Sequence, residues 1–171
     1  MSVSSDHLNT LVENELAKIG DPRVTRNIRS LRIPQRVEMR GWDYGAPGEC
    51  YPCWLVLAHP PSNTAIAYCE FGFGPATPWG LLFLEGEKSQ LSLGMDSGWF
   101  KCFLDACFDS MALTELPIWR VFRRLGSAFP GIPITEEGSW CAAWSEVMRL
   151  RAEQSEFQYG CYHSVHVGKD N

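Results

Sequence analysis

Residues 53–69, CWLVLAHPPSNTAIAYC, contain the clearest structural signal in the sequence. Two apolar runs, CWLVLA and TAIAYCEFGF, are separated by the short segment HPPSN (59–63). Short apolar runs with turn residues between them are typical of paired strands. The two prolines cannot donate sheet hydrogen bonds, and a serine followed by an asparagine suits a turn. The stretch therefore predicts an antiparallel hairpin whose connection is residues 59–63.

The residues on either side of this hairpin extend the strand pattern. A period of two begins near Arg36 and runs through Val37 and Met39 to Trp42, which predicts a strand before the hairpin. After it, FGFGPATPWG (71–80) interrupts the pattern and WGLLFLE (79–85) predicts a further strand. No GK[ST] follows the glycines, and prolines occupy positions 75 and 78, so we predict a structured turn rather than a phosphate-binding loop.

Three further segments have apolar residues at helical spacing. The first runs from about residue 6 to 19 and stops at Gly20 and Pro22. The second begins near residue 99, with Asp96 or Ser97 as its N-cap. The third begins at Thr135, after LPIWRVFRRL and a predicted loop, AFPGIPI (128–134). Their shared faces are Leu8, Leu11, Val12, Leu16 and Ile19 in the first, Trp99, Phe100, Phe103, Leu104, Cys107, Phe108 and Met111 in the second, and Trp140, Trp144, Val147, Met148 and Arg151 in the third.

These elements predict one α+β domain, with a single antiparallel sheet of four to six strands and helices packed against it. The chain of 171 residues, 45% apolar, has the size and composition of one folded domain. Residues 1–35 are expected to be helical, 36–95 rich in strands and 96–155 rich in helices. A C-terminal strand is expected over 156–168, because apolar and aromatic residues alternate from Phe157 to Val167.

The N-terminal sequence and the cysteines predict a cytoplasmic protein. MSVSSDHLNTLVENELAK has no basic region followed by an apolar run, and runs such as CWLVLA are far shorter than the ~20 residues that span a bilayer. The seven cysteines are an odd number, and without an export signal they are expected to be reduced thiols. We expect neither a membrane segment nor a cofactor.

The motif ECYPCW (49–54) raises the question of a metal or redox site. A redox CxxC belongs between a strand and a helix, whereas Cys50 and Cys53 begin a predicted strand. A zinc site would need further ligands, and Cys161 with His163 could supply them if the C-terminal strand lay beside this one. Because CxH is not a common zinc spacing, we predict packed thiols and no metal.

Two sets of residues could carry out catalysis, which keeps a small enzyme as one alternative. His59 and Glu70 belong to the same hairpin and could form an acid–base pair. Ser97 lies in GMDSG, but Met95 stands where a GxSxG motif needs glycine, and an N-cap is the simpler interpretation. We therefore predict no catalytic residue.

Charge is distributed unevenly along the chain, whose net charge is −5. Residues 41–119 contain nine acidic and two basic residues, a local charge of −7. Six arginines precede them, and Pro34 interrupts the series, so a helical stripe for nucleic acid is not expected. We predict instead that the arginines form a solvated face or pair with the acidic middle. The six are Arg23, Arg26, Arg29, Arg32, Arg36 and Arg40.

The stretches HPPSNTAIAYCEFGFG, PWGLLFL and GMDSGWFKCFLDACF resemble the small α+β immunity proteins of bacterial polymorphic or contact-dependent toxin systems. The resemblance covers roughly residues 36 to 120. It implies inhibition of a cognate toxin, often a basic nuclease, by stoichiometric binding through acidic side chains.

The sequence thus predicts a binding protein whose partner is a basic protein. Acidic residues at strand ends would steer the encounter, and nearby aromatic residues would supply buried contacts. A homodimer formed through exposed tryptophans is a further alternative. The candidate binding residues are Asp43, Glu49, Glu70, Glu85, Glu87, Trp42, Tyr44, Tyr51 and Trp79.

Overall fold

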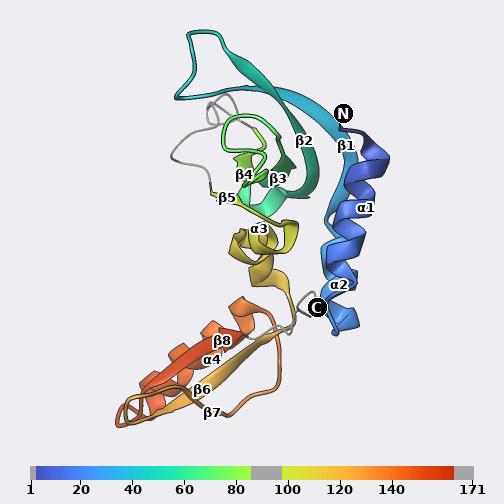
Figure 1. Ribbon diagram of the computed structural model, residues 1–171. Coiled ribbons are helices and arrows are strands. Elements are labelled where there is room, and N and C mark those ends of the chain that lie inside the picture. The colour runs from blue at the N-terminus through green and yellow to red at the C-terminus, as the bar shows by residue number, and fades with distance from the viewer. Residues whose placement is uncertain (1–2, 86–97, 164–171) are drawn as a thin grey trace. The chain divides into compact units, whose positions relative to one another are not determined.

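The computed structural model describes residues 3–85 and 98–163 of the chain (Figure 1). The predicted α+β class is confirmed, because the described residues form helices and antiparallel strands. The strands make two sheets, of five and three strands, rather than the single sheet expected. Glu87, Ser97 and the proposed cap Asp96 lie outside the described residues.

The chain divides into two compact units where one domain was predicted. Unit 1 comprises residues 1–18 and 28–113, and unit 2 comprises residues 19–27 and 114–171. Neither unit is continuous in sequence, and the boundary between residues 27 and 28 falls within helix α2 (Pro22–Ser30).

Unit 1 is built on the five-stranded sheet, ordered β1-β2-β3-β4-β5 with every neighbouring pair antiparallel. The predicted hairpin is confirmed, since β2 and β3 pair from Trp54–Tyr68 to His59–Thr64. Its connection is the 3₁₀ turn Pro60–Ser62, followed by Asn63 at φ 56°, a left-handed conformation that asparagine tolerates well. The strands are β1 (Arg32–Gly41), β2 (Cys50–His59), β3 (Thr64–Tyr68), β4 (Trp79–Phe83) and β5 (Trp99–Phe100).

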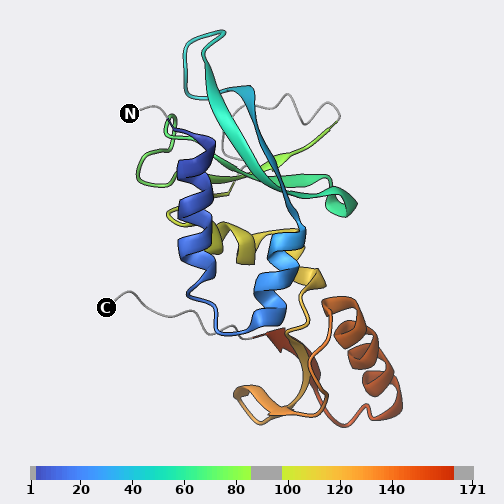
Figure 2. The same ribbon diagram turned by 90° about the vertical axis from the view of Figure 1, so that its right-hand side faces the viewer.

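Helices α1 (Ser5–Leu16) and α3 (Phe103–Asp109) pack together in unit 1, as Figure 2 shows. The N-cap of α1 is Ser4, whose side chain accepts from the His7 amide. Phe103 is fully buried and meets the ring of Trp79 in β4 at 5.3 Å between centroids. This contact packs α3 on the sheet.

The predicted start of the second helix is wrong. Trp99 and Phe100 form strand β5, which pairs with Trp79 and Gly80, and α3 begins only at Phe103. Its N-cap residue, Cys102, makes no capping bond through its side chain. The cap comes instead from α1, because the Glu15 carboxylate accepts from the amides of Phe103 (3.0 Å) and Leu104 (2.8 Å). A contact across 88 residues leaves no local signal in the sequence.

Unit 2 contains the three-stranded sheet, ordered β7-β6-β8, and helix α4 (Trp140–Glu153). The strands are β6 (Trp119–Leu125), β7 (Ala128–Pro133) and β8 (Tyr159–His163). The helix covers the sheet with Ala143, Val147 and Leu150, which form a core with Val121 and Tyr159. The predicted shared face of this helix is therefore wrong: Val147 joins the core, whereas Trp144 and Met148 are 36% and 53% exposed and Trp140 stacks on Trp144.

The predicted loop AFPGIPI is also wrong, because it contains strand β7. A strand with prolines is tolerated at a sheet edge, and β7 is an edge strand. Gly131 has φ 102°, and a Cβ there would lie 2.3 Å from the Arg123 carbonyl oxygen, so only glycine fits. The Gly–Pro signal therefore marked an irregular edge strand.

Most arginines between Asp21 and Arg40 pair with carboxylates. Among the residues that the structure describes, the acids in these pairs are Glu13, Asp21, Glu38 and Glu137, which lie outside residues 41–119. The pairs are Arg23 with Asp21 and Glu137, Arg29 and Arg32 with Glu13, and Arg36 and Arg40 with Glu38.

The Asp21 carboxylate gives a pH prediction for unit 2. Hydrogen bonds from the side chain and amide of Arg23 lower the pKa of Asp21 to about 2, from an ordinary value of 3.8. Because the folded pKa is the lower one, the stabilisation by Asp21 is complete above the unfolded value and is lost as pH falls from 3.8 to about 2. NMR titration of the carboxyl carbon should show this midpoint, and Arg23→Gln should raise it toward 3.8. An unchanged midpoint in that variant would contradict the assigned cause.

None of the helices in residues 3–85 and 98–163 combines the length and apolar composition needed to cross a bilayer.

Candidate functional site

Two loops meet at one end of the five-stranded sheet in unit 1. The first joins β1 to β2 through residues 42–49, and the second joins β3 to β4 through residues 69–78. They lie at the same end because the antiparallel register places Gly41 opposite Cys50 and Tyr68 opposite Trp79. Both loops are rich in aromatic residues. We call the following set the aromatic end: Trp42, Tyr44, Tyr51, Phe71 and Phe73.

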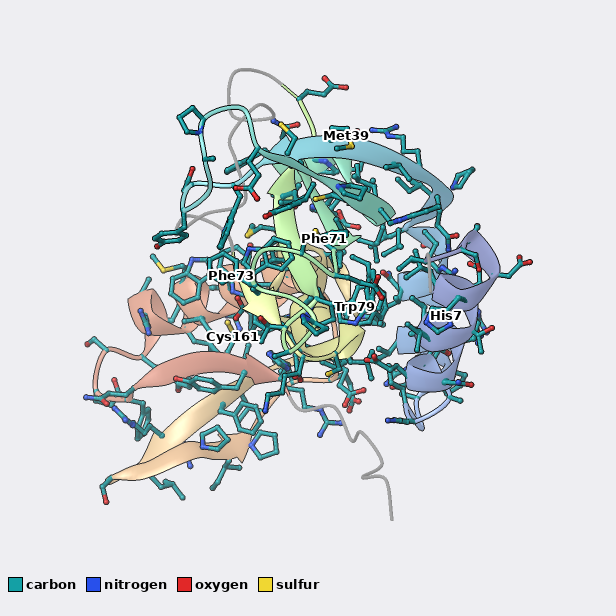
Figure 3. All side chains as sticks on the ribbon, turned by 45° about the horizontal axis from the view of Figure 1, so that its top comes forward. His7, Met39, Phe71, Phe73, Trp79 and Cys161 are labelled. Atoms are coloured by element: carbon teal, nitrogen blue, oxygen red, sulfur yellow. The ribbon has the colours of Figure 1, made fainter. Side chains whose placement is uncertain are left out.

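The rings of the aromatic end form a continuous cluster. Trp42 contacts Tyr44 and Tyr51, each with 5.9 Å between centroids, and Phe73 joins the two loops by meeting Tyr44 at 6.0 Å. Phe71 stacks on Tyr51 at 5.1 Å with 13° between the ring planes. The cluster remains partly open, since Tyr44 is 55% and Phe71 47% exposed. Figure 3 marks Phe71 and Phe73.

Glycines hold the second loop in the shape that presents these rings. Gly72 has φ 67°, and a Cβ there would lie 3.4 Å from the indole nitrogen of Trp42. At Gly74 a Cβ would lie 2.6 Å from the Cys69 carbonyl oxygen, a distance that no side chain allows. The FGFG sequence is therefore explained by the close approach of the loop to its own backbone and to Trp42.

Three carboxylates surround the aromatic end, and they differ in role. Glu49 is turned back into its own loop, where it accepts from the Ala46 amide at 2.8 Å and from the Tyr51 hydroxyl. Both hydrogen bonds lower the pKa of Glu49, and the one from Tyr51 has the larger effect. Asp43 is exposed between Trp42 and Tyr44. Glu70 adjoins Phe71 and accepts a long hydrogen bond of 3.4 Å from the Tyr68 hydroxyl.

A pocket of about 430 Å³ opens beside Phe71 on one face of the sheet. Its floor follows from the register, because Val37 lies opposite Trp54 and Trp54 lies opposite Tyr68. Glu70 is the only carboxylate among the described residues that line it. Burial, together with the charge of Glu70, raises the pKa of Tyr68. The lining residues are Val3, Val37, Pro52, Trp54, Tyr68, Glu70 and Phe71.

The carboxylates of this site are not neutralised within the part of the chain that the structure describes. No ion pair there involves Asp43, Glu49 or Glu70, whereas all three arginines of β1 and two of the three in α2 pair with other acids. An aromatic surface with unpaired negative charge suits a positively charged partner.

Several predicted site residues fall elsewhere. Trp79 is 2% exposed and packs in the core, so it is removed from the candidate surface. Glu85 is exposed and follows β4. Its carbonyl oxygen accepts a hydrogen bond from the Asn63 side-chain amide at 2.9 Å, and its backbone amide donates one to Asn63 Oδ1 at 3.0 Å. Asn63 belongs to the opposite end of the sheet from Trp42, so Glu85 does too. Asp43, Glu49 and Glu70 are thus brought together with Trp42, Tyr44 and Tyr51.

The His59–Glu70 pair, which the sequence left open as an alternative, is not formed. His59 pairs with Thr64 at the start of β3, and Glu70 follows the last residue of that strand, so the two occupy opposite ends of the hairpin. His59 is buried at 4% exposure, with Nδ1 2.7 Å from the Ser62 hydroxyl. That hydroxyl also contacts Thr64 Oγ1 at 2.7 Å, an arrangement typical of a braced turn.

The seven cysteines all carry free thiols in the structure. Cys50 and Cys53 belong to unit 1, and Cys161 with His163 to unit 2. Within residues 3–85 and 98–163, no three His, Cys, Asp or Glu side chains gather as metal ligands would. Cys53 is buried beside Cys69, and the hydrogen bond between these thiols raises the pKa of Cys53.

Sequence reasoning missed Phe71, Phe73 and Trp54. The sequence FGFG could have indicated Phe71 and Phe73 as surface residues, because a glycine-rich turn offers no core in which to bury them. Trp54 gave none, since it belongs to a strand of otherwise apolar residues. Comparison of the chain with protein-family models, curated protein sequences and solved structures gave no match.

Proposed function

We propose that this chain is a cytoplasmic protein-binding module of the immunity type, which silences a basic toxin-like protein by binding it at the aromatic end of unit 1. One observation carries the proposal: an exposed aromatic cluster is continuous with an apolar pocket, and Glu70 is the one carboxylate among the described residues that line this pocket. Exposed patches of this kind mark interaction surfaces.

The chemistry of the surface identifies the kind of partner. Aromatic side chains are the residues that contribute most to binding when a partner buries them. Trp54, Tyr68 and Phe71 also present π-faces to a cation, and Glu70 adds a full negative charge. A lysine or arginine side chain of the partner fits this combination, with its aliphatic stem against the rings and its charged head at Glu70. Asp43 would then act at the rim, where charges mainly set the association rate.

The binding function is favoured over an enzyme by the geometry of unit 1. The acid–base pair that an enzyme would need, His59 with Glu70, is separated by the length of β3. Glu49, the carboxylate most firmly held, is occupied by its own loop.

The test compares two double variants that change the net charge equally, from −5 to −1. Asp43→Lys with Glu70→Lys reverses the aromatic end, and Glu85→Lys with Asp109→Lys reverses exposed acids elsewhere in unit 1. The partner is the toxin domain that the immunity class places in the neighbouring reading frame. We expect the first variant to lower the association rate at least about tenfold relative to the second, measured by stopped-flow at low salt.

Equal association rates for the two double variants would show that only the overall charge matters, and would contradict a binding surface at the aromatic end. A neighbouring frame without a toxin domain would contradict the immunity assignment. Cells that express the toxin should be protected by the control variant and not by the aromatic-end variant. Glu49 is left unchanged because its substitution would disturb the loop itself.

Self-association is a second candidate, favoured by one feature of unit 2. Trp140 and Trp144 stack on the outer face of α4, with centroids 5.9 Å apart and planes within 7°. Trp144 and Met148 are 36% and 53% exposed, so this face would bury apolar surface against a second copy.

A further inference from the structure

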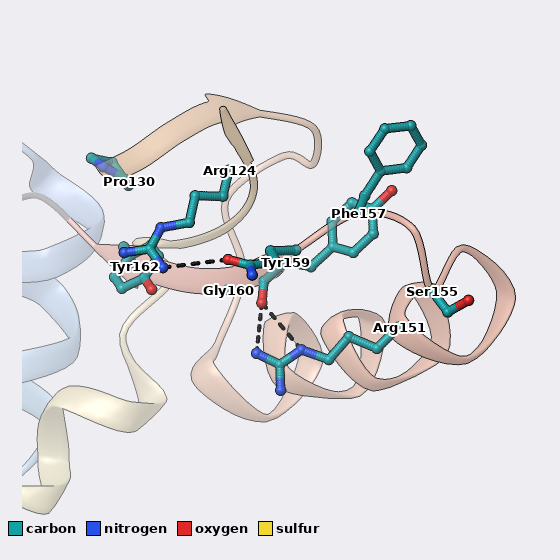
Figure 4. A pocket seen from close by; sticks show the side chains of 9 residues that line it. Arg124, Pro130, Arg151, Ser155, Phe157, Tyr159, Gly160 and Tyr162 are labelled. Carbon is teal, nitrogen blue, oxygen red and sulfur yellow. Dashed lines mark hydrogen bonds between the residues drawn. The ribbon is translucent and has the colours of Figure 1, made fainter. Parts of the chain in front are cut away.

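Unit 2 contains a second pocket whose charge is opposite to that of the aromatic end. It has a volume of about 330 Å³ and lies beside β8, strands β6 and β7, and the end of α4 (Figure 4). Two arginines, Arg124 and Arg151, line it, and no carboxylate does so among the described residues. The other lining residues are Pro130, Ser155, Phe157, Gln158, Tyr159, Gly160 and Tyr162.

Arg151 is held in place by a backbone carbonyl and a tryptophan ring. Its Nε and Nη2 atoms donate to the Tyr159 carbonyl oxygen at 3.2 and 2.6 Å, and its guanidinium lies 5.4 Å from the Trp144 ring centroid. No ion pair involves Arg151 in the described part of the chain. A guanidinium that is bound to a neutral carbonyl keeps its full positive charge. Because the carbonyl already fixes its orientation, little side-chain entropy is lost when an anion binds.

Arg149, two residues away on the same helix, has the opposite arrangement. Its guanidinium donates to Glu146 at 2.6 and 2.8 Å and also pairs with Glu153. Arg149 does not line the pocket. The helix therefore neutralises Arg149 at its surface, whereas Arg151, beside the pocket, has no acidic partner within residues 3–85 and 98–163.

The remaining walls indicate what the anion is attached to. Phe157, which is 40% exposed, and the rings of Tyr162 and Pro130 offer flat apolar surface. Gln158 orients Arg124 through a weak contact of 3.4 Å, and the Ser155 hydroxyl can donate a further hydrogen bond. The volume is near the lower end of the usual range for small-molecule sites, roughly 300–1,000 Å³.

We propose that this pocket of unit 2 binds a small aromatic molecule that carries an oxyanion, a carboxylate or a phosphate, with the oxyanion at Arg151 and Arg124 and the ring against Phe157 and Tyr162. Arginine matches both oxyanions because its donors form a planar fork. The proposal is independent of the aromatic end, since every lining residue belongs to unit 2.

The test is an NMR titration of the full chain at low salt with phenyl phosphate and, separately, with benzoate. Saturable shifts are expected at the amides of Ser155, Gly160 and Tyr162. Benzyl alcohol, which has the ring without the charge, and inorganic phosphate, which has the charge without the ring, should each bind at least about tenfold more weakly. The stronger of the two charged probes identifies which oxyanion the site prefers.

Variants separate a built site from general electrostatic attraction. Arg151→Gln and Arg124→Gln should each weaken phenyl phosphate or benzoate binding about tenfold, and the matched control Arg149→Gln should leave it unchanged. Arg124→Gln keeps the test valid if loss of the Arg151–Tyr159 contact unfolds the first variant. The proposal is overturned if neither charged probe gives saturable shifts, if benzyl alcohol binds as well as they do, or if Arg149→Gln weakens binding equally.

Discussion

Replacing Phe103 with alanine is expected to lower the free energy of unfolding by about 3–5 kcal/mol. Phe103 is fully buried at the first residue of α3 and packs edge-on against Trp79, which is itself 2% exposed and in contact with Tyr68. Truncation would leave a cavity between the helix and the sheet that neither can close without moving. The measurement is denaturant unfolding monitored by far-UV circular dichroism.

Lys101→Ala is the control for this prediction, because Lys101 is exposed two residues earlier and makes no contribution to the core. Its effect is expected to lie within about 0.5 kcal/mol. Equal and small losses in the two variants would mean that Phe103 does not join α3 to the sheet.

The second large effect is expected from Glu15→Ala, at about 2–3 kcal/mol, because it leaves two amides of α3 without an acceptor. The carboxylate of Glu15 is divided between them, with Oε1 bound by Phe103 and Oε2 by Leu104. It takes the place of the N-cap side chain that Cys102 does not provide. Glu15→Gln retains one strong acceptor and should lose less than the alanine variant.

Asn14→Ala provides the matched control, since Asn14 is the exposed neighbour of Glu15 on the same helix. A helix-propensity effect would appear in both variants, and alanine would favour the helix in each. If Glu15→Ala is no less stable than Asn14→Ala, the Glu15 carboxylate does not cap α3.

Much of the fold could be predicted because its signals were local. The hairpin followed from HPPSN, whose prolines and asparagine specify a connection whatever lies around them. The start of α3 and the strand β7 could not be predicted in this way. α3 is capped from 88 residues away, and β7 is fixed by the approach of Gly131 to the Arg123 carbonyl, which becomes visible only when β6 lies beside it.

Only part of the candidate site could be predicted from the sequence, because its composition also depends on how the strands pair. The sequence shows which acids lie near strand ends but not at which end of the sheet, because successive connections in an antiparallel sheet lie at opposite ends. Asp43, Glu49 and Glu70 follow or precede strands at one end, and Glu85 lies at the other. Trp79 begins a strand at the aromatic end, yet its register turns the ring toward Phe103 and the core. Register, which the sequence leaves open, decides both cases.

The interleaving of the two units along the chain limits how the protein can be dissected. A cut after residue 113 would leave residues 19–27 with the N-terminal fragment, although they belong to unit 2. The C-terminal fragment would lose the Arg23 guanidinium that Glu137 binds, together with Asp21 beside it. A fragment of residues 114–171 should therefore fold less stably than the same residues in the intact chain. A separate peptide of residues 19–27 would restore this stability only at a concentration comparable to the effective concentration that the covalent link provides.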